Sequence, residues 1–214
     1  EDRCCHRGVK LSLGSYDKGG LMCGYHGLVY DGKGSCINNP GEKQNPSLGV
    51  RSYQVAERQN FIWIWTGDPA RADESLIIDW PYHDNWSCNY GHYDINANFM
   101  FMMDNLMDLT HLGYVHKSTI GGNPDQHDEA PITTTKTEKG AHFIRWMLDA
   151  IPPPSFVSVG GFEGNIDRWS DFEYVGPSSV LQWGGALPVG KNAQQNRLQK
   201  DALSLRLFHH ATPK

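Results

Sequence analysis

Cys4-Cys5-His6-Arg7-Gly8 and Cys23-Gly24-Tyr25-His26-Gly27 are the two stretches that decide how the first part of this chain folds. Each combines a cysteine and a histidine at short spacing, and residues 7–22 separate the two sets. Thiolates suit one iron ion, and neutral imidazoles on a second iron raise its reduction potential. Glycine tolerates the backbone angles that let two loops approach one centre. The pattern predicts paired loops holding a cluster of two unlike irons.

The spacing C-x-H followed by C-x-x-H resembles the Rieske [2Fe–2S] signature. The resemblance implies that Cys4 and Cys23 bind one iron, whereas His6 and His26 bind the other. A structural zinc site is the alternative interpretation. Zinc ligands of this composition usually occur as a cysteine pair followed by a histidine pair, so the order seen here favours the cluster.

Residues at two loop positions indicate which branch of the Rieske proteins the sequence resembles. Rieske proteins of respiratory complexes carry an additional disulfide-forming cysteine in each loop, and here Val9 and Tyr25 stand at those positions. The resemblance is therefore to the oxygenase and ferredoxin branch. Cys5 stands where the family commonly has proline, and it is not assigned as a ligand.

Composition excludes several classes of function. The chain has 214 residues and a net charge of −5, with a pI of about 6.0, so no nucleic-acid partner is indicated. The longest apolar runs are about five residues, too short to cross a membrane. Cys5, Cys36 and Cys88 have no evident pairing, which fits a reducing cytoplasm. Both ends of the sequence fall beside expected strands, so we expect an internal fragment of a longer protein.

The chain divides into three expected parts: a β domain over 1–67, a polar connector over 68–88, and a second domain over 89–214. The fold class is predicted as α+β, with a small antiparallel domain followed by a catalytic domain of antiparallel sheet and an iron-binding helix. Turn residues and alternation predict hairpins over 28–37 and 53–65, and strand 61–65 is expected to be buried on both faces. Later elements are expected as a strand over 90–96, a helix over 99 to about 112, and strands over 143–148, 168–174, 180–183 and 203–208.

The predicted helix carries a second set of candidate ligands. Asp104, Asp108 and His111 recur at i, i+4 and i+7, which places them on one face of a regular helix. His116 follows five residues later and would point elsewhere, so we expect the helix to distort or end near Gly113. Two histidines and one carboxylate form the facial triad of non-haem Fe(II) oxygenases, which leaves positions open for O2 and substrate.

The stretch 105–116 closely resembles the N-x-x-D-x-x-H-x-x-x-x-H motif of Rieske non-haem iron aromatic oxygenases. The resemblance implies that His111 and His116 bind a mononuclear Fe(II). It assigns Asp108 and Asn105 as candidate catalytic residues: Asp108 links the iron site to a Rieske histidine of a neighbouring subunit, and Asn105 lines the site. The family's third iron ligand, a late carboxylate, has no counterpart in this chain.

Other interpretations of this second motif are weaker. A zinc peptidase would require H-E-x-x-H, whereas Leu112 follows the first histidine and the spacing is one residue longer. An Asp–His pair on a helix surface could be a simple ion pair of little energy. A Rieske ferredoxin would end near Gly67, and a zinc-stabilised interaction module would contain no acid-labile sulfide.

Within the family, the sequence of residues 103–111 most resembles the group around vanillate and dicamba O-demethylases. That resemblance implies the oxygenase component of a multicomponent system: a reductase or ferredoxin relays electrons from NAD(P)H, and O2 is used to oxidise an aromatic substrate. O-demethylation or monooxygenation of an aromatic acid is expected, with ring dihydroxylation or methyl hydroxylation as alternatives. A homotrimer is implied. Arg168 and His209 are candidates for binding a substrate carboxylate, with neither preferred.

Overall fold

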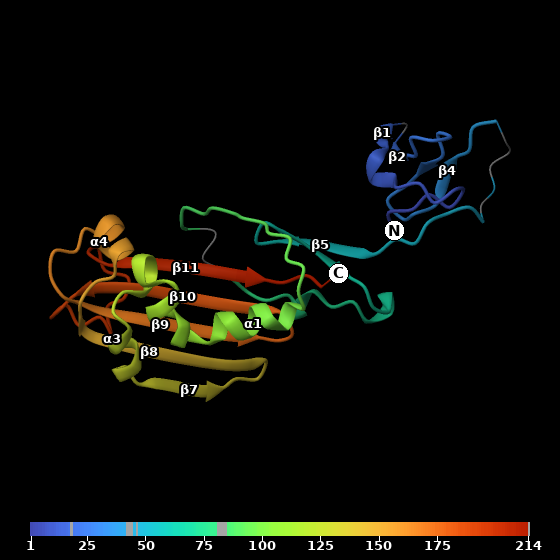
Figure 1. Cartoon of the computed structure of the whole chain (residues 1–214). Coiled ribbons are helices and arrows are strands. Elements are labelled where there is room, and N and C mark those ends of the chain that lie inside the picture. The colour runs from blue at the N-terminus through green and yellow to red at the C-terminus, as the bar shows by residue number, and fades with distance from the viewer. Residues whose placement is uncertain (18, 42–44, 46, 81–84, 214) are drawn as a thin grey trace. The chain divides into compact units, whose positions relative to one another are not determined.

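The computed structural model describes residues 1–17, 19–41, 45, 47–80 and 85–213 (Figure 1). It consists of two compact units, Glu1–Asp79 and Trp80–Lys214, which are described separately. The division falls inside the stretch 68–88 that was expected as a connector, of which residues 81–84 lie outside the described residues. Among the described residues, no helix is both long enough and apolar enough to cross a membrane.

The first unit is built on a four-stranded antiparallel sheet with the order β1-β2-β3-β4. Its strands are β1 (Ser15–Asp17), β2 (Gly20–Met22), β3 (Val29–Tyr30) and β4 (Cys36–Asn38), preceded by the short helix η1 (Leu11–Leu13). The β3–β4 pairing confirms the hairpin predicted over 28–37. Its small core contains both candidate cluster thiols together with Leu11, Leu28, Tyr30 and Cys36.

A second hairpin, β5 (Gln54–Arg58) and β6 (Phe61–Trp65), follows as predicted. Gln59 and Asn60 between the strands both have positive φ, as the tight turn of a two-residue hairpin requires. The prediction that 61–65 is buried on both faces is wrong: Ile62 and Ile64 are 75% and 57% exposed. Only the face with Trp63 and Trp65 is partly covered, because this hairpin is a separate two-stranded sheet. Two short helices, η2 (Pro69–Arg71) and η3 (Glu74–Leu76), complete the unit.

The second unit is organised by a five-stranded antiparallel sheet with the order β11-β10-β9-β8-β7. The predicted strands after residue 140 are all present and longer than expected. The strands are β7 (Ile132–Lys136), β8 (Gly140–Ala150), β9 (Ile166–Val175), β10 (Ser179–Pro188) and β11 (Leu203–His210). The strand predicted over 90–96 is absent, since these described residues form an irregular exposed segment that pairs with no strand.

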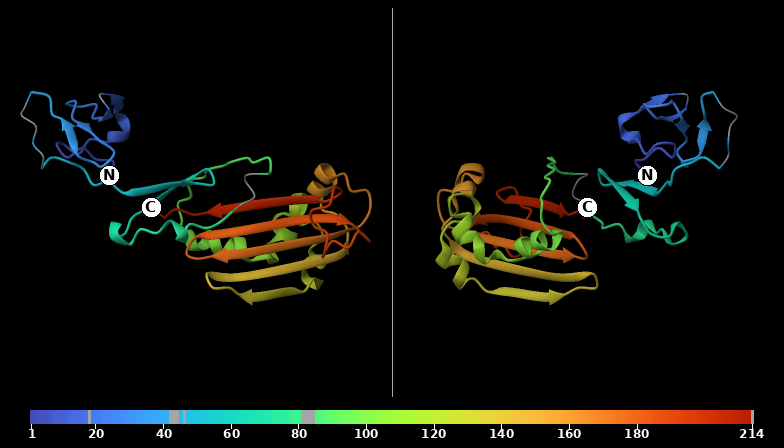
Figure 2. Two further views of the ribbon diagram at one scale, coloured as in Figure 1. Left: turned by 180° about the vertical axis from the view of Figure 1, so that it is seen from behind. Right: turned by 45° about the vertical axis from the view of Figure 1, so that its right-hand side comes forward.

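Helices cover one face of this sheet, as Figures 1 and 2 show. Leu109 and Leu112 pack against Phe143 of β8 and Phe172 of β9, which fixes the helical segment onto the sheet. The helical elements are α1 (Phe99–Met107), η5 (Leu109–His111), α2 (Leu112–Val115), the π-helical turn η6 (Lys117–Gly121), α3 (Pro124–Glu129) and α4 (Pro154–Gly160).

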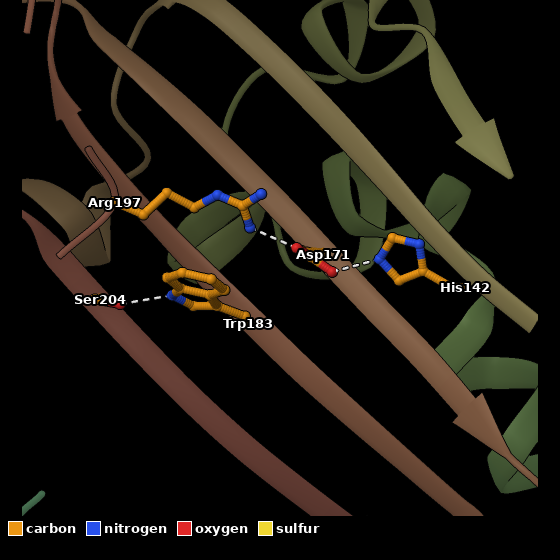
Figure 3. A network of polar contacts seen from close by, with 5 residues as sticks. All are labelled: His142, Asp171, Trp183, Arg197 and Ser204. Atoms are coloured by element: carbon orange, nitrogen blue, oxygen red, sulfur yellow. Dashed lines mark hydrogen bonds and ion pairs between the residues drawn. The ribbon is translucent and has the colours of Figure 1, made fainter. Parts of the chain in front are cut away.

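The opposite face of the sheet carries a polar network over a tryptophan cluster (Figure 3). Asp171 of β9 accepts a hydrogen bond from His142 of β8 at 2.7 Å and forms an ion pair with Arg197. The Arg197 guanidinium lies 4.4 Å from the centre of the Trp183 ring. Because Arg197 belongs to the segment between β10 and β11, these contacts hold that segment against the sheet.

We expect Asp171→Ala to lower the free energy of unfolding by about 1–3 kcal/mol, because two partly buried partners lose their acceptor. Asp201→Ala is the matched control: its ion pair with Lys191 is about half exposed, so its loss should cost less than about 1 kcal/mol. Chemical denaturation of the purified variants measures both values. Equal losses in the two variants would contradict a structural role for the Asp171 network.

Candidate metal centres

The two cysteine–histidine loops have the same backbone pattern. In the first, Cys4 N–H donates to Val9 O at 2.9 Å, and Gly8 N–H donates to Cys4 O at 2.9 Å. The second repeats it, with Cys23 N–H donating to Leu28 O at 2.8 Å and Gly27 N–H donating to Cys23 O at 3.0 Å. Gly8 and Gly27 both take positive φ, 69° and 74°, which explains why glycine occurs at these positions.

The side chains of the two loops converge as a cluster site requires. Cys4 and Cys23 are 4% and 2% exposed, whereas both histidines are exposed. The rings of His6 and His26 have centroids 4.6 Å apart. Among the described residues, no three His, Cys, Asp or Glu side chains converge on a single point.

Tyr30 lies beneath the first loop and contacts two thiols. Its hydroxyl oxygen is 3.1 Å from Cys4 Sγ and 3.2 Å from Cys5 Sγ. Burial, together with these thiols, raises the pKa of Tyr30, so the hydroxyl keeps its proton and can donate it. Burial acts to raise the pKa of Cys4, but hydrogen bonds from Tyr30 and from the His6 backbone outweigh it and lower the pKa. The surroundings of Cys4 therefore favour a thiolate.

We expect Tyr30→Phe to lower the reduction potential of a cluster bound here, because a hydrogen bond to a ligand sulfur favours the reduced, more negative state. A loss of about 1 kcal/mol corresponds to roughly 40 mV for one electron. Redox titration followed by electron paramagnetic resonance measures the change. Tyr25→Phe is the matched control, since its exposed ring contacts the His26 ring with centroids 3.8 Å apart and a phenylalanine ring preserves that contact. Equal shifts in both variants would argue against the Tyr30 hydrogen bond.

The second candidate site lies where α1 ends. The predicted helix over 99–112 is wrong in its length: α1 stops at Met107, and Asp108 has extended dihedrals (φ −99°, ψ 104°). Asp108 accepts hydrogen bonds from Thr110 N at 2.9 Å and from Thr110 Oγ1 at 2.7 Å, and so caps η5. These two bonds lower the pKa of Asp108. Asp104, Asp108 and His111 thus do not share one helical face as predicted, because this local capping interrupts the helix.

His111 and His116 converge despite their spacing of five residues. His111 is the last residue of η5 and His116 is the C-cap of α2, and their ring centroids are 5.3 Å apart. The expected distortion between the two histidines is present, but it lies between His111 and Leu112, where the helix type changes, and not at Gly113. Gly113 is buried within α2, where a Cβ atom would lie 2.5 Å from Pro124 Cα. Both histidines are partly exposed and can contribute ligands to one ion.

The structure gives less information on the roles of the three remaining candidate residues, Asn105, His209 and Arg168. Asn105 is exposed on the last turn of α1, so its role at the iron site stays a prediction. His209 is 3.3 Å from Gln182 Oε1 through its Nε2, on the helix-covered face, and burial lowers its pKa. Arg168, the other candidate for a substrate carboxylate, instead donates to the backbone carbonyl groups of Ile120 and Gly121.

Comparison with known proteins assigns both units. Residues 1–54 match the Rieske [2Fe–2S] domain. Residues 95–214 match the vanillate O-demethylase oxygenase C-terminal domain, which is more than half of the chain. The chain belongs to the vanillate O-demethylase oxygenase family. Membership confirms the predicted family, the α+β architecture and the two cofactors of such proteins, a Rieske cluster and a mononuclear non-haem iron. The individual ligand assignments stay predictions.

Several members of the oxygenase family resemble the chain over most of its length. The toluene-4-sulfonate monooxygenase system iron-sulfur subunit of Comamonas testosteroni is 35% identical over 100% of the chain, which covers 62% of that relative. The vanillate O-demethylase oxygenase subunit of a Pseudomonas species is 38% identical over 89% of the chain and 60% of that relative. The crystal structure of dicamba monooxygenase bound to 3,6-dichlorosalicylic acid superposes with a TM-score of 0.87 at 32% identity, covering 99% of this chain and 62% of that one. The chain thus spans about three fifths of the length of these relatives.

Proposed function

We propose that this chain acts in the oxygenase component of a multicomponent system. That component takes electrons relayed from NAD(P)H by a separate reductase or ferredoxin and uses O2 to oxidise an aromatic substrate, by O-demethylation or monooxygenation. The observation that carries the proposal is the presence of two distinct sets of ligand-type residues, one in each unit of the chain. An electron carrier alone would need only the first set.

The residues fit the two cofactors of the family. Cys4, Cys23, His6 and His26 would hold the [2Fe–2S] cluster, and His111 with His116 would hold the Fe(II), whose third ligand we expect from a carboxylate outside this sequence. When bound, the cluster stores and passes single electrons and the Fe(II) activates O2. The buried thiols keep their side of the cluster site from water, while the exposed imidazoles offer the contact surface for a partner.

Asp108 is proposed to link the two kinds of site between subunits. Its carboxylate is exposed and its pKa is lowered, so it is ionised and can accept a hydrogen bond from a protonated imidazole nitrogen. We propose that this nitrogen belongs to a cluster-binding histidine of the next subunit in a head-to-tail homotrimer. We also propose a cytoplasmic location, which fits the five free cysteines of the chain.

The substrate class is inferred from the relatives. Toluene-4-sulfonate, vanillate and dicamba, which the names of the relatives specify, are all aromatic anions. We therefore propose a small aromatic acid as the substrate. For an aryl methyl ether, hydroxylation of the methyl carbon gives a hemiacetal that collapses to a phenol and formaldehyde.

Electron paramagnetic resonance of anaerobically purified, dithionite-reduced protein tests the proposal first. A rhombic signal with a low average g value is expected from a histidine-ligated cluster. With a reductase and NADH, a panel of aromatic acids should then give substrate-dependent O2 uptake, and formaldehyde from methyl ethers. Bound zinc without acid-labile sulfide would refute the proposal in favour of a zinc-stabilised module.

A further inference from the structure

Arg168 is a buried charge with unusual partners. It lies on β9, on the face that the helices cover, and is only 5% exposed. Its Nη1 donates to Gly121 O at 3.1 Å and its Nη2 donates to Ile120 O at 2.7 Å. No ion pair with a carboxylate forms at Arg168 within the described part of the chain. Burial, together with the charge of Arg145, lowers the pKa of Arg168 to about 10. Its guanidinium carbon also lies 4.9 Å from the centre of the Phe156 ring of α4. A charge buried at such cost against carbonyl groups and an aromatic ring needs an explanation.

The two carbonyl groups belong to the turn that follows His116. Within η6, Thr119 N–H donates to His116 O at 3.0 Å and Gly121 N–H donates to the same oxygen at 2.8 Å. Gly121 therefore connects His116 to Arg168. Its N–H donates a hydrogen bond to the His116 carbonyl oxygen, and its own carbonyl oxygen accepts one from the Arg168 guanidinium. No side chain fits at Gly121, since a Cβ atom would lie 1.9 Å from Leu112 O. The turn is packed directly against the helix that carries His116.

Two further buried side chains support the same turn. His127 of α3 is 2.9 Å from Gly121 O through Nε2 and 3.2 Å from Arg145 Nη1 through Nδ1. Since arginine can only donate, Nδ1 accepts and Nε2 carries the proton that Gly121 O receives. Arg145 of β8 also reaches Leu109 O, at 3.5 Å, where η5 and the approach to His111 begin. Side chains from β8, β9 and α3 thus form hydrogen bonds with the backbone on both sides of the histidine pair.

We propose that Arg168 is a positioning residue for His116, acting through the carbonyl groups of Ile120 and Gly121. The inference rests on the proposed role of His116 as an iron ligand. Arg168 fixes the turn after His116, the turn fixes the His116 carbonyl, and the imidazole is thereby held 5.3 Å from that of His111 between ring centroids. The guanidinium is suited to this task because its planar fork can hold two adjacent carbonyl oxygens in fixed directions.

A purely structural role predicts something different. Replacing an unpaired buried charge by an apolar side chain of similar volume is often neutral or stabilising. If Arg168 only filled space, its replacement would change thermal stability and leave the metal site as it was. A positioning residue instead changes the affinity of the site for its metal, and loss of such supporting partners typically costs about 10- to 100-fold in affinity.

The test uses Arg168→Met and Arg168→Lys in the holoprotein, with Arg197→Met as the matched control. Arg197 lies on the opposite face of the same sheet and binds Asp171 (Figure 3). Anaerobic Fe(II) titration gives the affinity of the mononuclear site, and hydrogen–deuterium exchange over 112–123 reports the turn without any metal. The cluster signal of the first unit serves as an internal control for folding.

Arg168→Met should weaken Fe(II) binding by about 10- to 100-fold and accelerate exchange over 112–123, with the cluster signal unchanged. Arg168→Lys, which keeps a donor, should recover part of both, and Arg197→Met should change neither. Normal Fe(II) affinity in a folded Arg168→Met protein overturns the inference. If Arg168→Met does not fold, the test rests on Arg168→Lys, and wild-type Fe(II) affinity and exchange in that variant overturn the inference. His116→Ala separates the proposed ligand role of His116 from the proposed positioning role of Arg168. If Fe(II) affinity survives this change, both proposals are refuted. If Fe(II) affinity is lost in His116→Ala but not in the Arg168 variants, only the positioning role is refuted.

Discussion

Asp108→Asn is expected to leave both metal sites occupied while lowering substrate-coupled turnover by about 10- to 100-fold. The carboxylate is exposed and ionised, and it lies three residues before His111. As a negative acceptor it can bind the N–H of an imidazole and stabilise that imidazole when it becomes positively charged. The neutral amide of asparagine offers a weaker acceptor and no charge, so the proposed link between subunits is lost.

The structure indicates that this variant will fold. Asp108 caps η5 through Thr110 N at 2.9 Å, and asparagine caps helices about as well as aspartate. Asp104→Asn is the matched control, because Asp104 is exposed on the preceding helix α1 and makes the same change of charge. Steady-state product formation against NADH consumption measures coupling, and metal analysis with the cluster signal verifies both sites. Wild-type turnover in Asp108→Asn, with both metals present, would count against the bridging role.

Short-range patterns predicted the first unit well. The loop spacing predicted two paired loops, and the structure shows two matching turns, each with its own glycine, Gly8 or Gly27. The cluster-ligand roles of Cys4, His6, Cys23 and His26 stay predictions. The hairpins and the strands after residue 140 follow from alternation along the sequence. The prediction missed the exposed face of β6. Aliphatic residues such as Ile62 and Ile64 are expected to be buried, and the sequence does not show whether a neighbouring element covers them.

At the second candidate site the predicted helix geometry was wrong, and the roles of its residues stay predictions. Helical periodicity extended α1 through Asp108, but the side chain of that residue bonds its own backbone two residues on and ends the helix. A spacing of five would not point two histidines of a regular helix at one ion, so the sequence predicted a distortion between them. Two short helical turns of different type do bring the two rings together.

The supporting cluster of His127, Arg145 and Arg168 had no signal in the sequence. Its members come from one helix and two strands, and they meet only through the pairing of β8 with β9 and the packing of α3 on β8. Arg168 was one of two candidates for binding a substrate carboxylate, and the sequence alone does not show that its side chain is buried. In the structure its guanidinium donates to the Ile120 and Gly121 carbonyl groups, the contacts on which the proposed positioning role rests.

Cys23→Ala and His116→Ala are each expected to abolish turnover while removing only one metal. Cys23 is 2% exposed in the core of the first unit, and without its thiolate the cluster loses one of four protein ligands. His116 lies in the second compact unit, so its loss should remove the mononuclear Fe(II) and leave the rhombic cluster signal. Iron and sulfide analysis with electron paramagnetic resonance checks both results. Loss of both metals in either variant would show instead that the two units depend on one another for folding.

Mixing these two inactive variants tests how electrons travel. If a cluster serves the iron of the next subunit in a head-to-tail ring, an intact cluster in a His116→Ala subunit can serve an intact iron in a Cys23→Ala neighbour. After dissociation and random reassembly of equal amounts, about one quarter of the subunit junctions join such a pair, so about one quarter of wild-type turnover should return. Transfer confined within one subunit would restore none, because no single chain in the mixture carries both metals. Unmixed samples of each variant, treated in the same way, provide the baseline.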